Sequence, residues 1–146
     1  MSLRSILTIA LLMFLFTSCK SKQETANSKG DIIILENKTW VLDSWITNET
    51  IKSFKSTEDI QLVFNDSLKQ VYGIDGCNRI HGKYSIQGDS LKIGSLVSTK
   101  KYCGKESSEY EQAFQVFLQQ DIEYKYSKTF LQLKSERDLL LFKVLK

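Results

Sequence analysis

The 146-residue chain contains no proline, a single histidine and only three cysteines. Without proline there is no proline-rich linker and no X-Pro bond whose slow isomerisation would delay folding. The single histidine, His81, is the one imidazole that could activate a cysteine nucleophile such as Cys77. A metal site would need further cysteine or histidine ligands, and the chain has none to spare. We therefore expect no bound metal and no cofactor.

The sequence motifs of several enzyme classes are also absent. The chain has no phosphate-binding loop, no Gly-x-Ser-x-Gly element and no dinucleotide-binding fingerprint. Acidic residues occur at Asp75, Glu106, Glu109 and Glu111, but their spacing does not single out a working pair of carboxylates. We therefore predict no catalytic residue and no enzymatic activity.

Composition and charge indicate a folded protein that does not bind nucleic acid. Hydrophobic residues make up 42% of the chain and aromatic residues 11%, which is too much apolar content for general disorder. The formal net charge is only +3, and the basic residues are spread along the sequence. This charge is too weak for a nucleic-acid-binding surface or a polybasic membrane-binding segment. The length suits one domain, which we expect to be a monomer.

The N-terminus resembles a bacterial lipoprotein signal peptide. Arg4 precedes an apolar run over residues 6–16, which fits a signal-peptide core and is shorter than the roughly twenty residues of a membrane span. Two small residues, Thr17 and Ser18, then precede Cys19. In such signals the cysteine is lipidated and becomes the mature N-terminus. The alternative is an ordinary secretory signal that happens to contain a cysteine.

These features divide the chain into three parts and predict its location. Residues 1–18 form the signal peptide, residues 19–30 a flexible tether without large apolar side chains, and residues 31–146 the folded domain. A lipid on Cys19 would hold the protein at a membrane. Because no aspartate directly follows Cys19, we expect an outer-membrane anchor facing the periplasm, in an organism that has two membranes.

Alternation of apolar and polar residues predicts a mainly β domain. Such period-two patterns occur over residues 40–45, 61–64, 70–72, 83–86, 91–93, 122–126, 130–133 and 139–144. In the first of them, Trp40 and Leu42 would share one face, with Trp45 on the other. The short breaks between the later segments favour antiparallel neighbours. We predict an α+β fold, with a small antiparallel barrel-like sheet of about seven to eight strands and one packed amphipathic helix.

Residues 108–120 break the alternation and predict the helix. Apolar residues recur at helical spacing, at positions 110, 113, 114, 117 and 118. Ser108 and Glu111 match a capping box, in which two side chains bond the free amides at the helix start. We expect this helix to pack on the sheet and to bury Phe114 and Phe117.

Residues 73–84 concentrate three glycines, a cysteine and the histidine between two predicted strands. Gly73 and Gly76 suit a positive φ or a close backbone approach, and Asn78 tolerates the left-handed region. In an oxidising compartment, a disulfide from Cys77 to the downstream Cys103 would restrict the unfolded chain by roughly 3 to 4 kcal/mol. Free thiols, with Cys77 activated by His81, are the alternative; a metal site is a weaker one.

The pattern Gly-x-x-Gly-Cys-Asn-x-x-x-Gly-x-Tyr, followed by Thr-x-x-x-Cys, resembles the core of the META domain, the HslJ-like family of envelope lipoproteins. It comprises Gly73, Gly76, Cys77, Asn78, Gly82, Tyr84, Thr99 and Cys103. The resemblance implies a small β-barrel-like domain with a packed helix. It also implies a lipoprotein associated with envelope stress or antibiotic tolerance, and it brings no catalytic residue.

Three functional hypotheses follow. The first is a non-enzymatic lipoprotein that supports the envelope by binding an unidentified envelope protein or ligand. The second is a carrier whose barrel holds a small ligand, although the many Phe, Tyr and Leu residues favour a filled interior. The third is an inhibitor of a secreted hydrolase that displays a loop such as residues 46–59.

Overall fold

The computed structural model of the chain describes residues 35, 38–48, 50–52 and 59–145. The predicted signal peptide (residues 1–18), the lipidation site Cys19 and the tether (residues 19–30) lie outside the described residues. The division into these parts therefore stays a prediction. No helix in the described ranges combines the length and apolar character needed to cross a membrane.

The described residues form ten strands and one helix. The strands are β1 (Thr39–Thr47), β2 (Thr50–Ile51), β3 (Gln61–Asn65), β4 (Gln70–Ile74), β5 (Arg79–Gln87), β6 (Ser90–Ile93), β7 (Val97–Ser98), β8 (Ile122–Tyr126), β9 (Phe130–Lys134) and β10 (Asp138–Val144). The helix, α2, is Lys105–Leu118 and lies between β7 and β8 in the sequence.

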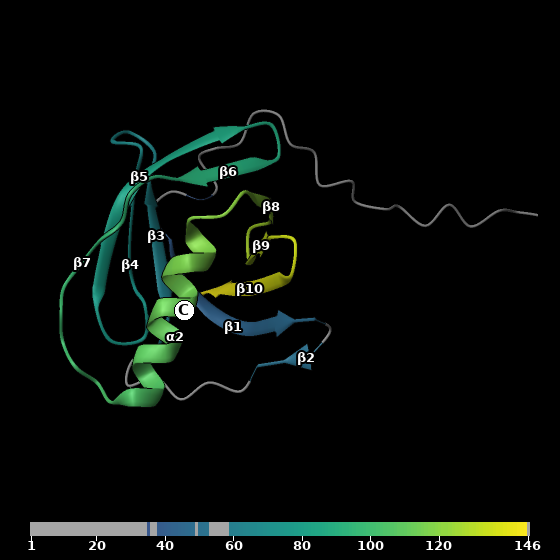
Figure 1. Cartoon of the computed structure of the whole chain (residues 1–146). Coiled ribbons are helices and arrows are strands. Elements are labelled where there is room, and N and C mark those ends of the chain that lie inside the picture. Colours follow the sequence, from purple (N-terminus) through teal and green to yellow (C-terminus); the bar gives the residue numbers. More distant parts are fainter. Residues whose placement is uncertain (1–34, 36–37, 49, 53–58, 146) are drawn as a thin grey trace, which may run out of the picture.

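Eight of the strands close into an antiparallel barrel. The hydrogen-bonded order is β1-β3-β4-β5-β6-β8-β9-β10, and β10 pairs with β1 to complete the circuit. The two shortest strands lie off this path, with β2 paired to β1 and β7 paired to β5. Closure leaves the eight barrel strands without a free edge. The predicted fold class, a small antiparallel barrel with one packed helix, is confirmed (Figure 1).

The eight predicted strands lie within the eight barrel strands. The largest difference is at β5, which begins at Arg79 although the alternation suggested a start near residue 83. His81 and Gly82 therefore lie in a strand and not in a turn. Strands β2 and β7 have only two residues each, which is too short for a period-two pattern to be recognised.

The prediction that Trp45 faces away from Trp40 is wrong. A β-bulge interrupts the pairing of β1 with β10, so that Leu42 pairs with Phe142 while Ser44 pairs with Leu141. The extra residue reverses the alternation beyond it. Both tryptophan side chains are consequently buried in the same core.

The helix packs its large apolar side chains against the barrel. Phe114 and Phe117 are buried, as predicted, and each ring centroid lies 6.3 Å from that of Trp45. In the view of Figure 1, α2 lies between β4 on one side and β1 and β10 on the other. The predicted capping box is wrong, because the residue before the helix is Gly104, at φ 100°, and no side chain caps the start. Glu111 is instead buried.

Apolar side chains from all eight barrel strands and from α2 form a single core. Its largest fully buried members include Trp40, Trp45, Phe64, Phe114 and Phe142. Such aromatic side chains bury large areas and dominate the stability of a small core. The described interior is therefore occupied by the protein's own side chains.

Gly73 lies where β3 approaches β4 too closely for any side chain. A Cβ atom built at this position would lie 2.1 Å from the carbonyl oxygen of Gln61, whereas one built at Gly94 would lie 3.6 Å from the nearest atom, the carbonyl oxygen of Lys83. We predict that Gly73→Ala lowers the free energy of unfolding by about 2 kcal/mol or more, since the backbone must shift. Gly94→Ala, the matched control, should change it by less than about 0.5 kcal/mol. Urea denaturation measures both, and equal stabilities would contradict the close approach.

Candidate functional site

The stretch singled out in the sequence forms the tight turn between β4 and β5. The Oδ1 atom of Asp75 accepts hydrogen bonds from the backbone N–H groups of Cys77 (3.2 Å) and Asn78 (2.7 Å). The N–H of Asp75 donates to the carbonyl oxygen of Asn78 (3.0 Å). Gly76 takes the positive φ of 102° that the turn requires. Asp75 is fully buried here, so its carboxylate serves to close the turn.

Asn78 connects this turn to two other segments. Its Nδ2 group donates to Glu111 Oε2 on α2 (2.9 Å). Its Oδ1 atom accepts from Thr99 Oγ1 (2.9 Å) and from the N–H of Lys101 (2.7 Å) in the segment that leads to α2. Asn78 does not adopt the left-handed region that asparagine tolerates, because it is not among the described residues with positive φ. The hydrogen bonds of its side chain, and not the tolerance of its backbone for positive φ, explain why an asparagine occupies this position.

The helix contributes three polar side chains to the same cluster. Ser107 Oγ donates to Glu111 Oε1 (3.0 Å), and Gln115 Nε2 donates to Asp75 Oδ2 (2.7 Å). Together with Asp75, Asn78 and Thr99 they form what we call the polar network. Ser107 and Glu111 lie on the buried face of α2. Because both are polar, the spacing of apolar residues in the sequence could not identify them as buried. Every buried side-chain nitrogen and oxygen among the described residues has a hydrogen-bond partner.

A disulfide lies beside the polar network. Cys77 and Cys103 are bonded, with Cα atoms 6.0 Å apart, as the sequence predicted. Their sulfurs and a Glu111 carboxylate oxygen lie within 4.8 Å of one another, which is the spacing of a three-ligand metal cluster. However, the sulfurs are bonded to each other, so neither is the thiolate that a metal would need. Both Glu111 oxygens already accept hydrogen bonds. The arrangement is therefore structural.

The remaining motif residues also support the fold. A Cβ atom at Gly82 would lie 3.1 Å from Leu96 and 3.2 Å from the carbonyl oxygen of Ser95, so this glycine leaves room for the segment between β6 and β7. The buried Tyr84 ring packs edge-on against Phe64, with ring centroids 5.2 Å apart.

The structure does not assemble a Cys–His pair. Cys77 is buried and disulfide-bonded, whereas His81 lies exposed on the outer face of β5. There its ring stacks on that of Tyr72, with centroids 6.4 Å apart and an angle of 24° between the planes. Of the acidic residues considered above, Glu106 and Glu109 are exposed, while Asp75 and Glu111 belong to the polar network.

A groove on the outside of the barrel is the feature that sequence reasoning missed. Strands β3, β4, β5 and β7 surround a hollow of about 690 Å³, which we call the outer groove. Its lining includes Tyr72, His81 and Val97, together with the polar side chains of Gln61, Gln70 and Arg79. These residues alternate with core residues and come from four different strands, so the pairing of the strands brings them together.

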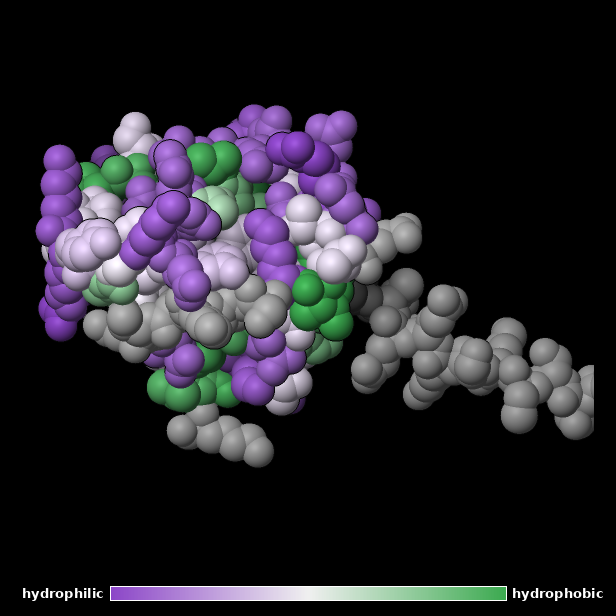
Figure 2. Space-filling model, turned by 60° about the horizontal axis from the view of Figure 1, so that its bottom comes forward, coloured by the Kyte–Doolittle hydropathy of each residue, from purple (hydrophilic) through white to green (hydrophobic). Residues whose placement is uncertain are grey.

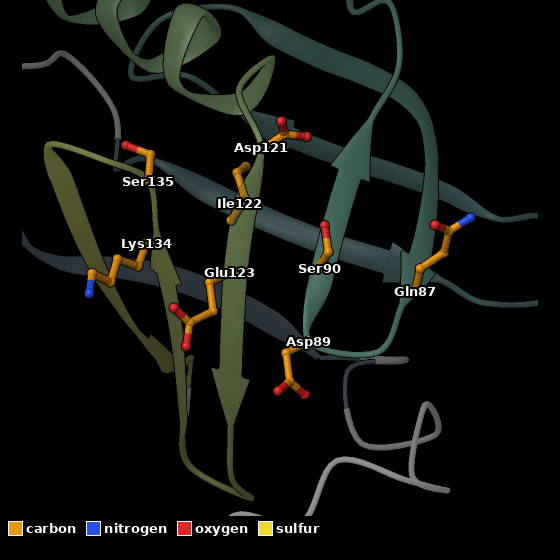
Figure 3. A pocket seen from close by; sticks show the side chains of 8 residues that line it. All are labelled: Gln87, Asp89, Ser90, Asp121, Ile122, Glu123, Lys134 and Ser135. Atoms are coloured by element: carbon orange, nitrogen blue, oxygen red, sulfur yellow. The ribbon is translucent and has the colours of Figure 1, made fainter.

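A second hollow, of about 490 Å³, lies where β6 and β8 are paired over only two residues. Figure 3 shows Asp89, Asp121 and Glu123 around it, with Ser90 on β6 and Lys134 on β9. Asp121 is paired with Lys92 and Glu123 with Lys125. Burial raises the pKa of the neighbouring Tyr124, with further contributions from Tyr126 and Asp89. The acidic groups are thus largely engaged in surface ion pairs.

The face shown in Figure 2 carries mainly hydrophilic residues, with apolar residues in separate small patches. Large exposed apolar side chains in the described part include Tyr72 and Val97 of the outer groove, and Val116 on α2. Scattered exposed apolar residues are normal on soluble proteins and need no explanation. Tyr72 and Val97 differ from the others because they line one groove.

The role of Asn78 in the polar network gives a pH-dependent prediction. Asn78→Asp would place a second carboxylate 2.9 Å from Glu111 Oε2 and remove the donor between them. We expect a loss of about 3 kcal/mol in the free energy of unfolding at neutral pH. Relative to wild type, this loss should shrink between about pH 7 and pH 4, because the two carboxylates can then share a proton.

The matched control is Asn65→Asp. Among the described residues, the Asn65 side chain bonds through its Oδ1 acceptor to the N–H of Leu68, and an aspartate also supplies this acceptor. Urea denaturation over this pH range measures both variants. A pH-independent loss for Asn78→Asp would show that the amide does not bridge to Glu111.

Solved structures share this fold. An NMR structure of a protein from Burkholderia xenovorans is similar, with a TM-score of 0.66 and 23% identity over 78% of this chain and 86% of that one. A crystal structure of a DUF4847 family protein from Bacteroides vulgatus has a TM-score of 0.55 and 15% identity over 78% of this chain and 96% of that one. At these identities the likeness shows the fold alone. No curated protein matches the chain.

The family is shown by a different comparison. The family model described as the META domain matches residues 34–146, which include all barrel strands, the helix and both bonded cysteines. The resemblance inferred from the Gly-Cys-Asn pattern is thereby confirmed. The chain belongs to the META domain family.

Proposed function

We propose that this chain is a non-enzymatic envelope lipoprotein that binds an envelope component at the outer groove and so supports the envelope under stress or in the presence of antibiotics. The observation that carries the proposal is the groove itself. It combines exposed Tyr72 and Val97 with the polar side chains of Gln61, Gln70 and Arg79. Apolar contact area with a few polar groups around it is typical of binding sites.

The polar network supports the absence of catalysis. In the described part of the chain, the buried carboxylates are those of Asp75 and Glu111. Asp75 accepts from two backbone amides and from Gln115, and Glu111 accepts from Asn78 and Ser107. A general acid or base must lie within hydrogen-bonding distance of the substrate group to which it transfers a proton, or from which it takes one. The carboxylates of Asp75 and Glu111 instead accept hydrogen bonds from groups of the β4–β5 turn and of α2.

The packed interior favours a binding surface over a carrier. A small barrel holds a ligand only where its inward side chains leave space, and here they form one continuous core. The outer groove and the hollow between β6 and β8 both lie on the outside of the barrel. The inhibitor hypothesis requires a loop such as residues 46–59. Because residues 49 and 53–58 lie outside the described residues, the structure does not test it.

The lipid anchor is the second part of the proposal. The basic N-terminus, the short apolar run and Cys19 support it, and the tether would let the domain move relative to a membrane. An outer-membrane anchor facing the periplasm would place the outer groove within reach of cell-wall and membrane components.

The anchor makes a prediction for cell fractionation. Wild-type protein should sediment with membranes, while Cys19→Ala should be recovered in the soluble envelope fraction, because the variant cannot be lipidated. Cys103→Ala, which removes a cysteine of the disulfide but leaves the lipidation site, serves as the control and should stay with membranes. Membrane recovery of Cys19→Ala equal to that of wild type would exclude the anchor.

The groove makes a prediction for crosslinking in cells. A photoreactive amino acid at Val97 in the groove should give a discrete adduct with an envelope component. The same group at Val116 on α2 should not, although the two side chains are nearly equally exposed, at 57% and 55%. Electrophoresis of the irradiated envelope fraction compares the two positions. Equal adducts at both positions, or an adduct at Val116 alone, would contradict binding at the groove.

A further inference from the structure

Basic side chains without acidic partners in the described part of the chain lie in and next to the outer groove: Arg79 and His81 line it, and Lys83 lies just beyond the lining, opposite Gln70. Arg79, His81 and Lys83 occupy alternate, outward positions on β5 and are exposed. None of the three forms an ion pair in the part of the chain that the structure describes. The ion pairs of that part join Lys69 to Asp66, Lys92 to Asp121, Lys125 to Glu123 and Lys143 to Asp43.

The basic residues of β5 differ from Lys143 of β10 in having no acidic partner among the described residues. On β10, Lys143 is bonded to Asp43, and this bond and the lysine charge lower the pKa of the aspartate. Among the described residues, Arg79, His81 and Lys83 have no such acidic partner, and the described lining of the groove contains no acidic side chain. Asp59 is exposed before β3 but lies outside the lining. The groove therefore keeps an uncompensated positive edge, which attracts anions.

A flat aromatic platform lies next to this edge. Tyr72 and His81 face each other across β4 and β5, and their rings are nearly parallel. The Tyr72 hydroxyl donates to the Gln70 side chain, which holds the ring in place. Such a ring offers an apolar face beside a polar rim, which suits the C–H face of a sugar ring. The amides of Gln61 and Gln70 can both donate to and accept from hydroxyl groups.

We infer that the outer groove binds an anionic glycan of the cell envelope. This inference rests on the proposed function and names the chemical class of its partner. Sugar rings would stack on Tyr72 and His81, while a carboxylate or phosphate group of the glycan would pair with Arg79 in the lining. Lys83, opposite Gln70 on the neighbouring strand, adds positive charge just beyond the lining. Arg79 is the strongest candidate for the anionic group, because a guanidinium binds such groups through two parallel hydrogen bonds. The volume of about 690 Å³ suits a short oligosaccharide segment.

The test uses the full chain, purified in non-ionic detergent, and a polyuronate oligosaccharide as the anionic probe. Calorimetry should detect binding that weakens as salt is added. A neutral glucan oligosaccharide of equal length should bind at least about tenfold more weakly, as expected when charge-assisted hydrogen bonds are lost. Arg79→Gln should weaken polyuronate binding about tenfold.

Arg137→Gln is the matched control, because Arg137 is exposed and lies outside the outer groove. It should leave the affinity unchanged, and Tyr72→Ala should weaken the binding of both oligosaccharides. Equal losses from Arg79→Gln and Arg137→Gln would overturn the inference, as would tighter binding of a single-stranded oligonucleotide than of polyuronate. An absence of polyuronate binding, with the crosslink at Val97 intact, would refute the glycan and leave the proposed function standing.

Discussion

The arrangement of the β4–β5 turn, α2 and the segment before α2 depends on the side-chain amide of Asn78. It bonds simultaneously to α2 through Glu111 and to the segment before α2 through Thr99 and Lys101. Buried polar groups are costly unless they are paired, and a fully paired set fixes one arrangement of the segments that carry it. Together with the bond from Gln115 to Asp75, this side chain lets the β4–β5 turn position the helix on the barrel. The disulfide joins two of the same segments covalently.

The residues of the family pattern help to form the β4–β5 turn or to join it to its neighbours. Gly73 permits the approach of β3, Gly76 permits the turn, and Gly82 makes room for the segment that leads to β7. Cys77 and Asn78 then fasten the turn to the helix. All of these roles concern the fold, so the pattern identifies an architecture and not a reaction. Under the proposed function, recognition would reside in outward residues such as Tyr72 and Arg79, which lie outside the pattern.

The β-bulge in β1 shows how one residue changes a larger part of the structure. Had β1 continued its alternation, Trp45 would point to solvent and α2 would lose the ring that packs against Phe114 and Phe117. Its indole N–H also donates to Asp138 at the start of β10 (2.8 Å), so the same ring links the barrel seam to the helix. Nothing local in the sequence from Trp40 to Trp45 marks the bulge, because it arises from pairing with β10.

By itself the sequence indicated the eight barrel strands and helix α2, and it favoured a Cys77–Cys103 disulfide over free thiols. These depend on local alternation, helical spacing and cysteine count, which neighbouring residues define. Only the tertiary structure decided barrel closure, the buried positions of Ser107 and Glu111, and the outer groove. Each requires residues distant in sequence to meet: β10 beside β1, α2 beside the β4–β5 turn, and Tyr72 beside His81 and Val97. Because a side chain's partners come from strand register, no local pattern could reveal that Arg79 and Lys83 of β5 lack an acidic partner among the described residues and lie near the Tyr72–His81 pair.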